Sequence, residues 1–163
     1  LWRTRADTVR ARVLERGCSD KLGSFVDVYD GSGADASLLL LPEIGLVAYD
    51  DPRFLGTLAF LERRLRRGDF LARYDRADDF GAPTVAFNLC TFWYINALAG
   101  VGRMDEARQL FESMLARCNH VGLLSEDIDP GSGELWGNFP QTYSLVGIVN
   151  AAMRLSKPWE SAL

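Results

Sequence analysis

Cysteine and histidine are scarce in this sequence. The three cysteines, Cys18, Cys90 and Cys118, are odd in number, widely spaced and form no C-x-x-C pair, which argues against a disulfide framework or a zinc site. The single histidine, His120, cannot build a histidine-rich metal site. Reduced cysteines are typical of cytoplasmic proteins, so we expect a cytoplasmic location.

Long apolar runs and a strong net charge are also missing. No run approaches the roughly 20 apolar residues of a membrane span, and the chain does not begin with the basic and apolar regions of a signal peptide. The formal net charge is -4. The basic cluster E-R-R-L-R-R at 62–67 falls on a predicted helix and is interpreted as a solvated face. We therefore expect neither a nucleic acid nor a membrane as a partner.

What remains is the composition of a globular protein. The chain has 163 residues, of which 48% are apolar and 25% are charged, enough for one domain with a sizeable core. The first residue is Leu1 rather than methionine, and a helical pattern begins immediately at Trp2. We interpret this start as a sign that the sequence belongs to a longer chain.

Hydrophobic periodicity predicts helices and no convincing strand. Asp50 or Asp51, followed by Pro52, predicts an N-cap and a proline at the first helical turn. The apolar run after Asp35 is interpreted as a buried helix that Pro42 kinks or ends. About six helices are expected, over residues 2–15, the run after Asp35, 51–67, 85–98, 105–117 and 144–155.

The connections between these helices alternate in length. The connections at 46–50 and 101–104 are short, whereas those at 18–34, 68–84 and 119–140 are long. Consecutive antiparallel helices place alternate connections at opposite ends of the array, so we expect the long loops to gather on one face. Long loops on a helical scaffold commonly carry binding and catalytic residues.

The long loops combine carboxylates, an arginine, amides and aromatic rings, a mixture that suits a sugar. Amides and arginine hydrogen-bond hydroxyl groups, rings stack on pyranose faces, and carboxylates supply the acid–base groups of glycoside hydrolysis. The alternative is that they are ordinary turn and cap residues. The residues in question are Arg73, Tyr74, Asp75, Asp78, Asp79, Glu126, Asp127, Asp129, Glu134, Trp136, Asn138, Phe139 and Gln141.

The acidic run D-I-D-P-G-S-G-E at 127–134 also invites comparison with a calcium-binding EF-hand loop. Such a loop needs glycine at its sixth position. Counted from Asp127, Gly131 falls at the fifth position and Ser132 at the sixth. The pattern fails, and we expect no metal site.

Several short segments together resemble glycoside hydrolase family fifteen, the glucoamylase and trehalase-like enzymes, and specifically the C-terminal part of the catalytic domain. The resemblance implies an all-α fold of the (α/α)6 barrel type, with residues 1–163 forming roughly its second half of about six helices. The segments are D-A-S-L-L-L-L-P, D-D-P-R-F, L-A-R-Y-D, F-N-L-C-T-F-W, G-R-M-D-E-A-R-Q-L-F, G-L-L-S-E-D-I-D-P-G-S-G and G-N-F-P-Q-T-Y-S, in the family's order over most of 35–152.

The same resemblance implies an inverting hydrolase of an α-glucoside or oligosaccharide, such as trehalose or a glucan end, that needs no cofactor. Inverting enzymes use one carboxylic acid to protonate the leaving oxygen and one carboxylate to activate water. The general base of the family maps onto Glu126 in G-L-L-S-E-D. The residues expected to bind substrate are Arg73, Tyr74, Phe87, Asn138 and Gln141.

The family's general acid, a glutamate that follows a tryptophan upstream of the base, has no counterpart here. The pair W-E occurs only at Trp159–Glu160, after the base. We therefore expect the acid to lie upstream of this sequence and the 163 residues alone to be inactive. The alternatives are a non-catalytic helical interaction domain and a truncated product that associates through an exposed half-barrel face.

Overall fold

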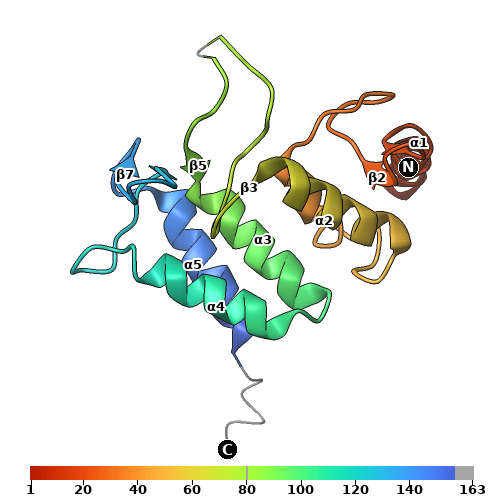
Figure 1. Ribbon diagram of the computed structural model, residues 1–163. Helices are drawn as coiled ribbons and strands as arrows, with labels where there is room; N and C mark the ends of the chain where they lie inside the picture. The colour runs from red at the N-terminus through yellow and green to blue at the C-terminus, as the bar shows by residue number, and fades with distance from the viewer. Residues whose placement is uncertain (80, 157–163) are drawn as a thin grey trace, which may run out of the picture. The chain divides into compact units, whose positions relative to one another are not determined.

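Helices dominate the computed structural model, which describes residues 1–79 and 81–156 (Figure 1). Within these ranges the chain forms five α-helices, one 3-10 helix and seven strands of two residues each. The expectation of a mostly helical chain is confirmed, but the strands were not expected, because two residues are too short to show an alternating pattern. Trp159 and Glu160 lie outside the described residues.

The chain divides into two compact units. The first consists of Leu1–Arg66 and Arg73–Pro83, and the second of Arg67–Ala72 and Thr84–Leu163. The prediction that 1–163 forms one domain of a half-barrel stays a prediction. No helix in the described part of the chain has the length and apolar character needed to cross a membrane.

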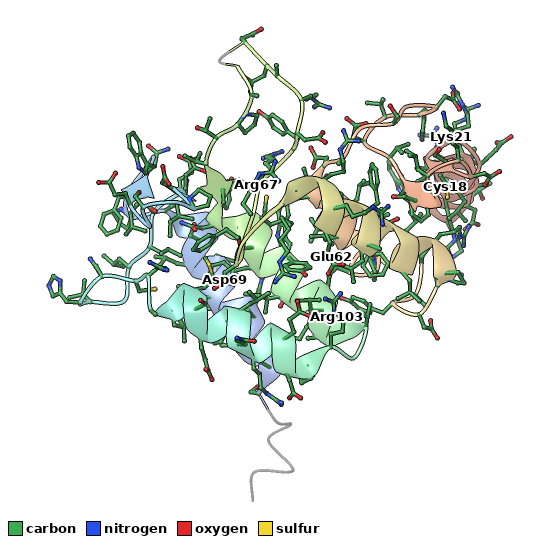
Figure 2. All side chains as sticks on the ribbon, in the orientation of Figure 1. Cys18, Lys21, Glu62, Arg67, Asp69 and Arg103 are labelled. Atoms are coloured by element: carbon green, nitrogen blue, oxygen red, sulfur yellow. The ribbon has the colours of Figure 1, made fainter. Side chains whose placement is uncertain are left out.

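In the first unit, α1 (Trp2–Arg16) is followed by a hairpin of β1 (Cys18–Ser19) and β2 (Ser24–Phe25). The helix ends at Arg16, one residue beyond the predicted range of 2–15, and is capped by Gly17, whose N–H donates to a carbonyl of the preceding turn. None of the residues of α1 is buried. Figure 2, which labels Cys18, shows that residue on the hairpin.

The apolar run after Asp35 forms a 3-10 helix, η1 (Ala36–Leu40), rather than a longer α-helix. Asp35 caps it by accepting a hydrogen bond from the N–H of Ser37. The next residue, Leu41, donates its N–H to a carbonyl only three residues earlier. Pro42 follows, and because it has no N–H it cannot extend the helix.

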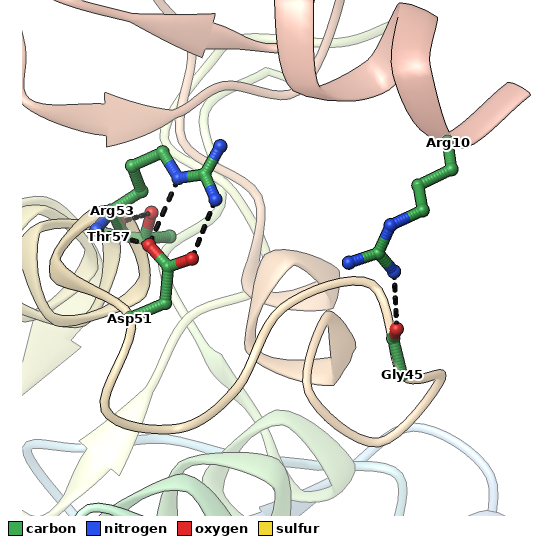
Figure 3. A network of polar contacts seen from close by, with 5 residues as sticks. All are labelled: Arg10, Gly45, Asp51, Arg53 and Thr57. Carbon is green, nitrogen blue, oxygen red and sulfur yellow. Dashed lines mark hydrogen bonds and ion pairs between the residues drawn. The ribbon is translucent and has the colours of Figure 1, made fainter. Parts of the chain in front are cut away.

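Helix α2 (Pro52–Leu65) begins as the sequence predicts, with Asp51 as its N-cap (Figure 3). The Asp51 carboxylate accepts the N–H of Arg53 at 2.9 Å and binds its guanidinium. The hydrogen bond from the Arg53 side chain, more than the backbone N–H or the charge of Arg53, lowers the pKa of Asp51 to about 2. The helix packs on β2, where Thr57 Oγ1 accepts the N–H of Phe25 at 2.8 Å.

The second unit is built on α3 (Asn88–Gly100), which packs against both α4 (Met104–Leu115) and α5 (Thr142–Leu155) (Figure 1). Helix α3 is apolar on nearly all sides because it is covered by these two neighbours. At Gly147 the backbone of α5 passes so close to α3 that an added Cβ would lie 2.5 Å from the Phe92 ring.

Five further short strands complete the described elements. Strand β5 (Ala86–Phe87) pairs antiparallel with β6 (Asp127–Ile128), which in turn pairs with β7 (Leu135–Trp136). This three-stranded sheet joins the start of α3 to the loop that precedes α5. Strand β4 (Phe70–Leu71) is buried against α3. Strand β3 (Arg66–Arg67) lies at the boundary of the two units.

One face of α5 exposes apolar side chains. Tyr143, Val146, Val149 and Met153 follow helical spacing, and between 48% and 71% of each is exposed. Exposed apolar faces of this kind are typical of association surfaces. Association through such a face stays a prediction.

Candidate functional site

The segment Leu124–Asp127 is held by backbone hydrogen bonds on both sides. The N–H of Gln141 donates to the carbonyl of Leu124 at 3.0 Å. Glu126 donates its N–H to the carbonyl of Asn138 at 2.9 Å and accepts the N–H of Asn88 at 3.0 Å. Leu124 is fully buried and anchors the segment. A carboxylate carried by this segment is therefore well fixed at its backbone.

Buried polar side chains complete this support. The carbonyl of Ser125 accepts hydrogen bonds from Asn88 Nδ2 at 2.9 Å and from Ser144 Oγ at 2.7 Å. Ser125 Oγ donates to the carbonyl of Asp127 at 2.5 Å. Asn88, Ser125 and Ser144 are all essentially inaccessible to solvent. The sequence did not predict these roles, although a polar residue in the first turn of an otherwise apolar helix is the signal that Asn88 and Ser144 share.

The Glu126 side chain is half-buried and is bound by Asn138. Its Oε2 accepts the backbone N–H of Asn138 at 3.1 Å and Asn138 Nδ2 at 2.7 Å. Its Oε1 accepts no hydrogen bond from any described residue. Among the two carboxylate oxygens, only Oε2 is thus committed to a partner within the described residues.

A second carboxyl group, that of Asp127, lies directly beside Glu126. Asp127 is half-buried in β6. Burial first, and then the charge of Glu126, raise the pKa of Asp127 to about 6. Perturbed carboxyl groups of this kind occur often at functional sites, so the two acids together mark the strongest candidate site in the second unit.

Gly137 separates these two carboxyl groups from the loop before α5. Its φ is +75°, a left-handed conformation that side chains other than glycine adopt only with strain. A Cβ at this position would lie 3.0 Å from Glu126 Oε2 and 3.1 Å from Asp127 Oδ2. The absence of a side chain therefore lets the backbone pass against both acids.

The elevated pKa of Asp127 predicts a pH-dependent effect on stability. Its unfolded carboxyl has a pKa near 3.8, so the folded chain holds the proton more tightly and ionised Asp127 lowers stability as the pH rises through about 4 to 6. The variant Asp127→Asn removes this cost. We expect it to have a higher free energy of unfolding than the native chain at about pH 8 and to lose the advantage below about pH 4.

Denaturant unfolding at a series of pH values checks this expectation, and Asp129 supplies a control of opposite sign. The N–H groups of Ser132 and Gly131 lower the pKa of Asp129. Asp129→Asn is therefore expected to be less stable than the native chain at about pH 8. If the free energy of unfolding of Asp127→Asn did not rise relative to the native chain between about pH 4 and pH 8, the assignment of Asp127 as a carboxyl whose ionisation is disfavoured would be contradicted.

The other predicted residues of the second unit lie at the edges of this site. Gln141 occupies the N-cap position of α5 but makes no side-chain capping hydrogen bond, and it contributes through its backbone N–H. Phe87 is half-buried in β5 and is paired with Asp127 across the strands. The structure therefore brings Phe87, Glu126, Asn138 and Gln141 together in one unit.

Arg73 and Tyr74 belong to the first unit, in the segment that follows β4. The carbonyl of Arg73 accepts the N–H of Ala36 at 2.8 Å, and the Arg73 side chain is exposed. Tyr74 Oη donates to Asp78 Oδ2 at 2.5 Å, a bond that raises the pKa of Tyr74. Arg76 stacks over the Tyr74 ring at 5.2 Å. The segment is thus ordered by contacts within its own unit.

The acidic loop after Glu126 forms a turn through its own backbone. Asp129 Oδ1 accepts the N–H of Gly131 at 2.7 Å and that of Ser132 at 2.9 Å. Across 1–79 and 81–156, no group of three or more histidine, cysteine or acidic residues is placed to hold a metal ion. The carboxylate of Asp129 therefore serves the turn.

Comparison with known proteins identifies the family of this chain. Residues 1–153 match the family described as glycosyl hydrolases family 15. The chain belongs to this family, which confirms the resemblance stated from its sequence segments.

Relatives in the family carry one recurrent name. The chain is 39% identical over 157 residues to "Trehalase" of Thermoplasma volcanium, a match that covers 96% of this chain and 25% of the relative. It is 32% identical over 164 residues to "Trehalase" of Mycobacterium tuberculosis, covering 99% of this chain and 24% of the relative. The chain thus spans about a quarter of the length of the curated relatives it matches.

Solved structures support the fold. A structure named "Glycosidase Wild Type" matches with a TM-score of 0.79 and 24% identity, covering 93% of this chain and 43% of that one. A variant of a glycosidase in complex with glucose matches with a TM-score of 0.79 and 23% identity, with the same coverage. At these identities the likeness establishes a shared fold.

Proposed function

We propose that this chain is the C-terminal half of an (α/α)6 glycoside hydrolase domain and supplies the general base, Glu126, for inverting hydrolysis of an α-glucoside. Trehalose is the favoured substrate because the curated relatives described above are named trehalases. A glucoamylase-type glucan end is the alternative substrate within the same mechanism. We further propose a cytoplasmic enzyme that uses no cofactor.

One observation carries the assignment of Glu126. Its backbone is fixed on both sides, and Asn138 binds one carboxylate oxygen while the other accepts no hydrogen bond from the described residues. A general base needs this combination, because the oxygen that receives the proton must be accessible and its orientation must be constant.

In the proposed step, Glu126 Oε1 accepts one proton of a water molecule while the water oxygen bonds to the anomeric carbon. The bond from that carbon to the leaving oxygen breaks, and the leaving oxygen takes a proton from a carboxylic acid. Inverting enzymes hold their two carboxyl groups about 6.5–9.5 Å apart so that the water fits between carbon and base.

The carboxylic acid is proposed to come from a segment outside these 163 residues. We use "parent enzyme" for the protein in which this sequence is joined to that segment. Arg73, Tyr74, Phe87 and Gln141 are proposed to contact the sugar in the parent enzyme, where arginine and amide groups bind hydroxyls and an aromatic ring covers an apolar face.

The variant Glu126→Gln tests the function in the parent enzyme. Gln is nearly the same size but cannot accept the proton, so we expect turnover of trehalose to fall by at least about 10²-fold. Proton NMR of the first products from trehalose should show α- and β-glucose in equal amounts, because water inverts the attacked anomeric carbon to β while the leaving glucose keeps its α configuration.

A matched control is Glu134→Gln, the same chemical change on an exposed glutamate of the same acidic loop. This variant is expected to keep native turnover. Near-native turnover by Glu126→Gln would exclude Glu126 as the base, and initial release of α-glucose without β-glucose would exclude the inverting mechanism.

A further inference from the structure

Asn138 and Glu126 bind each other at three points. The N–H of Glu126 donates to the carbonyl of Asn138 at 2.9 Å. In return, both the backbone N–H and Nδ2 of Asn138 donate to Glu126 Oε2, at 3.1 and 2.7 Å. Two donors of one residue thus converge on one oxygen. Hydrogen bonds to a charged acceptor are stronger than those between neutral groups, so this contact fixes the orientation of the carboxylate.

The exposure of Asn138 argues against a packing role. Its side chain lies at the surface, so removing it leaves no cavity in the core. The neighbouring residue, Gly137, adds no side chain between Asn138 and the two acids. The contact with Glu126 is therefore the main interaction that a substitution of the Asn138 side chain would change.

We propose that Asn138 is a positioning residue that binds Glu126 Oε2 and so reserves Oε1 as the oxygen that takes the proton from water. This inference rests on the proposed function of Glu126. It assigns Asn138 a role different from substrate binding: the amide acts on the base and not on the sugar. The proton leaves the water, ends on Oε1, and the Oε2 contact with Asn138 is retained throughout.

Two variants in the parent enzyme separate this role from its rivals. Asn138→Asp keeps the shape of the side chain but replaces the Nδ2 donor by a second negative charge facing Oε2, whereas Asn138→Leu only removes the donor. We expect kcat to fall roughly 10- to 100-fold with KM little changed, and the Asp variant to be the slower one.

Each rival role gives a different pattern. If Asn138 bound the sugar, both variants would raise KM while kcat stayed near native. If Asn138 were purely structural, Asn138→Leu would have a lower turnover than the isosteric Asn138→Asp and a lower free energy of unfolding. Either pattern would overturn the proposal. Asp127 carries the charge next to Glu126, so kcat and KM are also measured in the Asp127→Asn background. Asn150→Asp, on the exposed side of α5, is the matched control and should keep native kinetics.

A readout that does not need activity keeps the two proposals distinguishable. In the parent enzyme, the side-chain ¹⁵N signal of Asn138 is expected to shift in Glu126→Ala and to stay in place in Glu134→Ala. If the chemical shift of the Asn138 side chain did not change in Glu126→Ala, the positioning role would be overturned even if Glu126 proves to be the base. An active Glu126→Gln enzyme would instead overturn the proposed function while the NMR contact remains.

Discussion

Replacing Gly137 by alanine is expected to reduce turnover of the parent enzyme by about 10²-fold and to cost about 1–2 kcal/mol of stability. The loss of stability follows from its φ of +75°, where a Cβ is strained. The loss of turnover follows from the contact at 3.0 Å with Glu126 Oε2, because the new methyl group must push the carboxylate away from its bound position. Steady-state kinetics and denaturant unfolding measure the two effects separately.

Gly122 offers a control with the same strain and no contact. Its φ is +79°, and a Cβ built there meets nothing within 4 Å. Gly122→Ala should therefore lose about the same 1–2 kcal/mol while turnover stays native. If both variants lost turnover equally, loop strain and not the contact with Glu126 would explain the effect, and the close approach of Gly137 to the acids would have no catalytic meaning.

The sequence indicates a helix end most clearly where a capping residue, a proline or a glycine stands at that end. Gly17 ends α1, and Asp51 with Pro52 begins α2, because an N-cap side chain and a proline act within one turn. The apolar run after Asp35 was harder, because its composition suits an α-helix and a 3-10 helix equally. The exposure of α1 was not predicted, because burial depends on neighbours that periodicity does not reveal.

The candidate site was predictable only in part. The resemblance to the family pointed to Glu126, and the position of Gln141 next to a helix start was visible in the sequence. The pairing of Glu126 with Asn138 was not, because twelve residues separate them and the chain returns only through the short pairing of β6 with β7. The support from Asn88 was also hidden, since it comes from a residue 37 positions away from Ser125.

The close approach of α5 to α3 gives the second large prediction. In an open helix position, Gly→Ala stabilises by about 1 kcal/mol because alanine is the better helix former. At Gly147 we expect the opposite sign, a loss of about 1–3 kcal/mol, because the Cβ would lie 2.5 Å from the ring of Phe92, which is fully buried and cannot move aside. Denaturant unfolding of Gly147→Ala measures the sign directly.

Two further variants isolate the cause. Ala152→Gly, at an exposed position of the same helix, measures the propensity term alone and should cost about 1 kcal/mol. Phe92→Leu makes room for the new methyl group, so the double variant Gly147→Ala/Phe92→Leu should be more stable than the sum of the single changes predicts, by about 0.5–3 kcal/mol. If the changes in the free energy of unfolding were additive, the new methyl group at position 147 and the Phe92 ring would not be in steric conflict.

The variant Gly147→Ala also tests whether the packing of α5 on α3 affects the proposed base, Glu126. Ser144 on α5 and Asn88 on α3 both donate to the carbonyl of Ser125, which directly precedes Glu126. A methyl group that forces α5 away from α3 separates these two donors, and the carbonyl cannot keep both. We therefore expect Gly147→Ala to lower kcat of the parent enzyme as well as its stability, and Phe92→Leu to restore part of both. Restored stability without any recovery of kcat would show that Glu126 is held by its own strand and loop, independently of how closely the two helices pack.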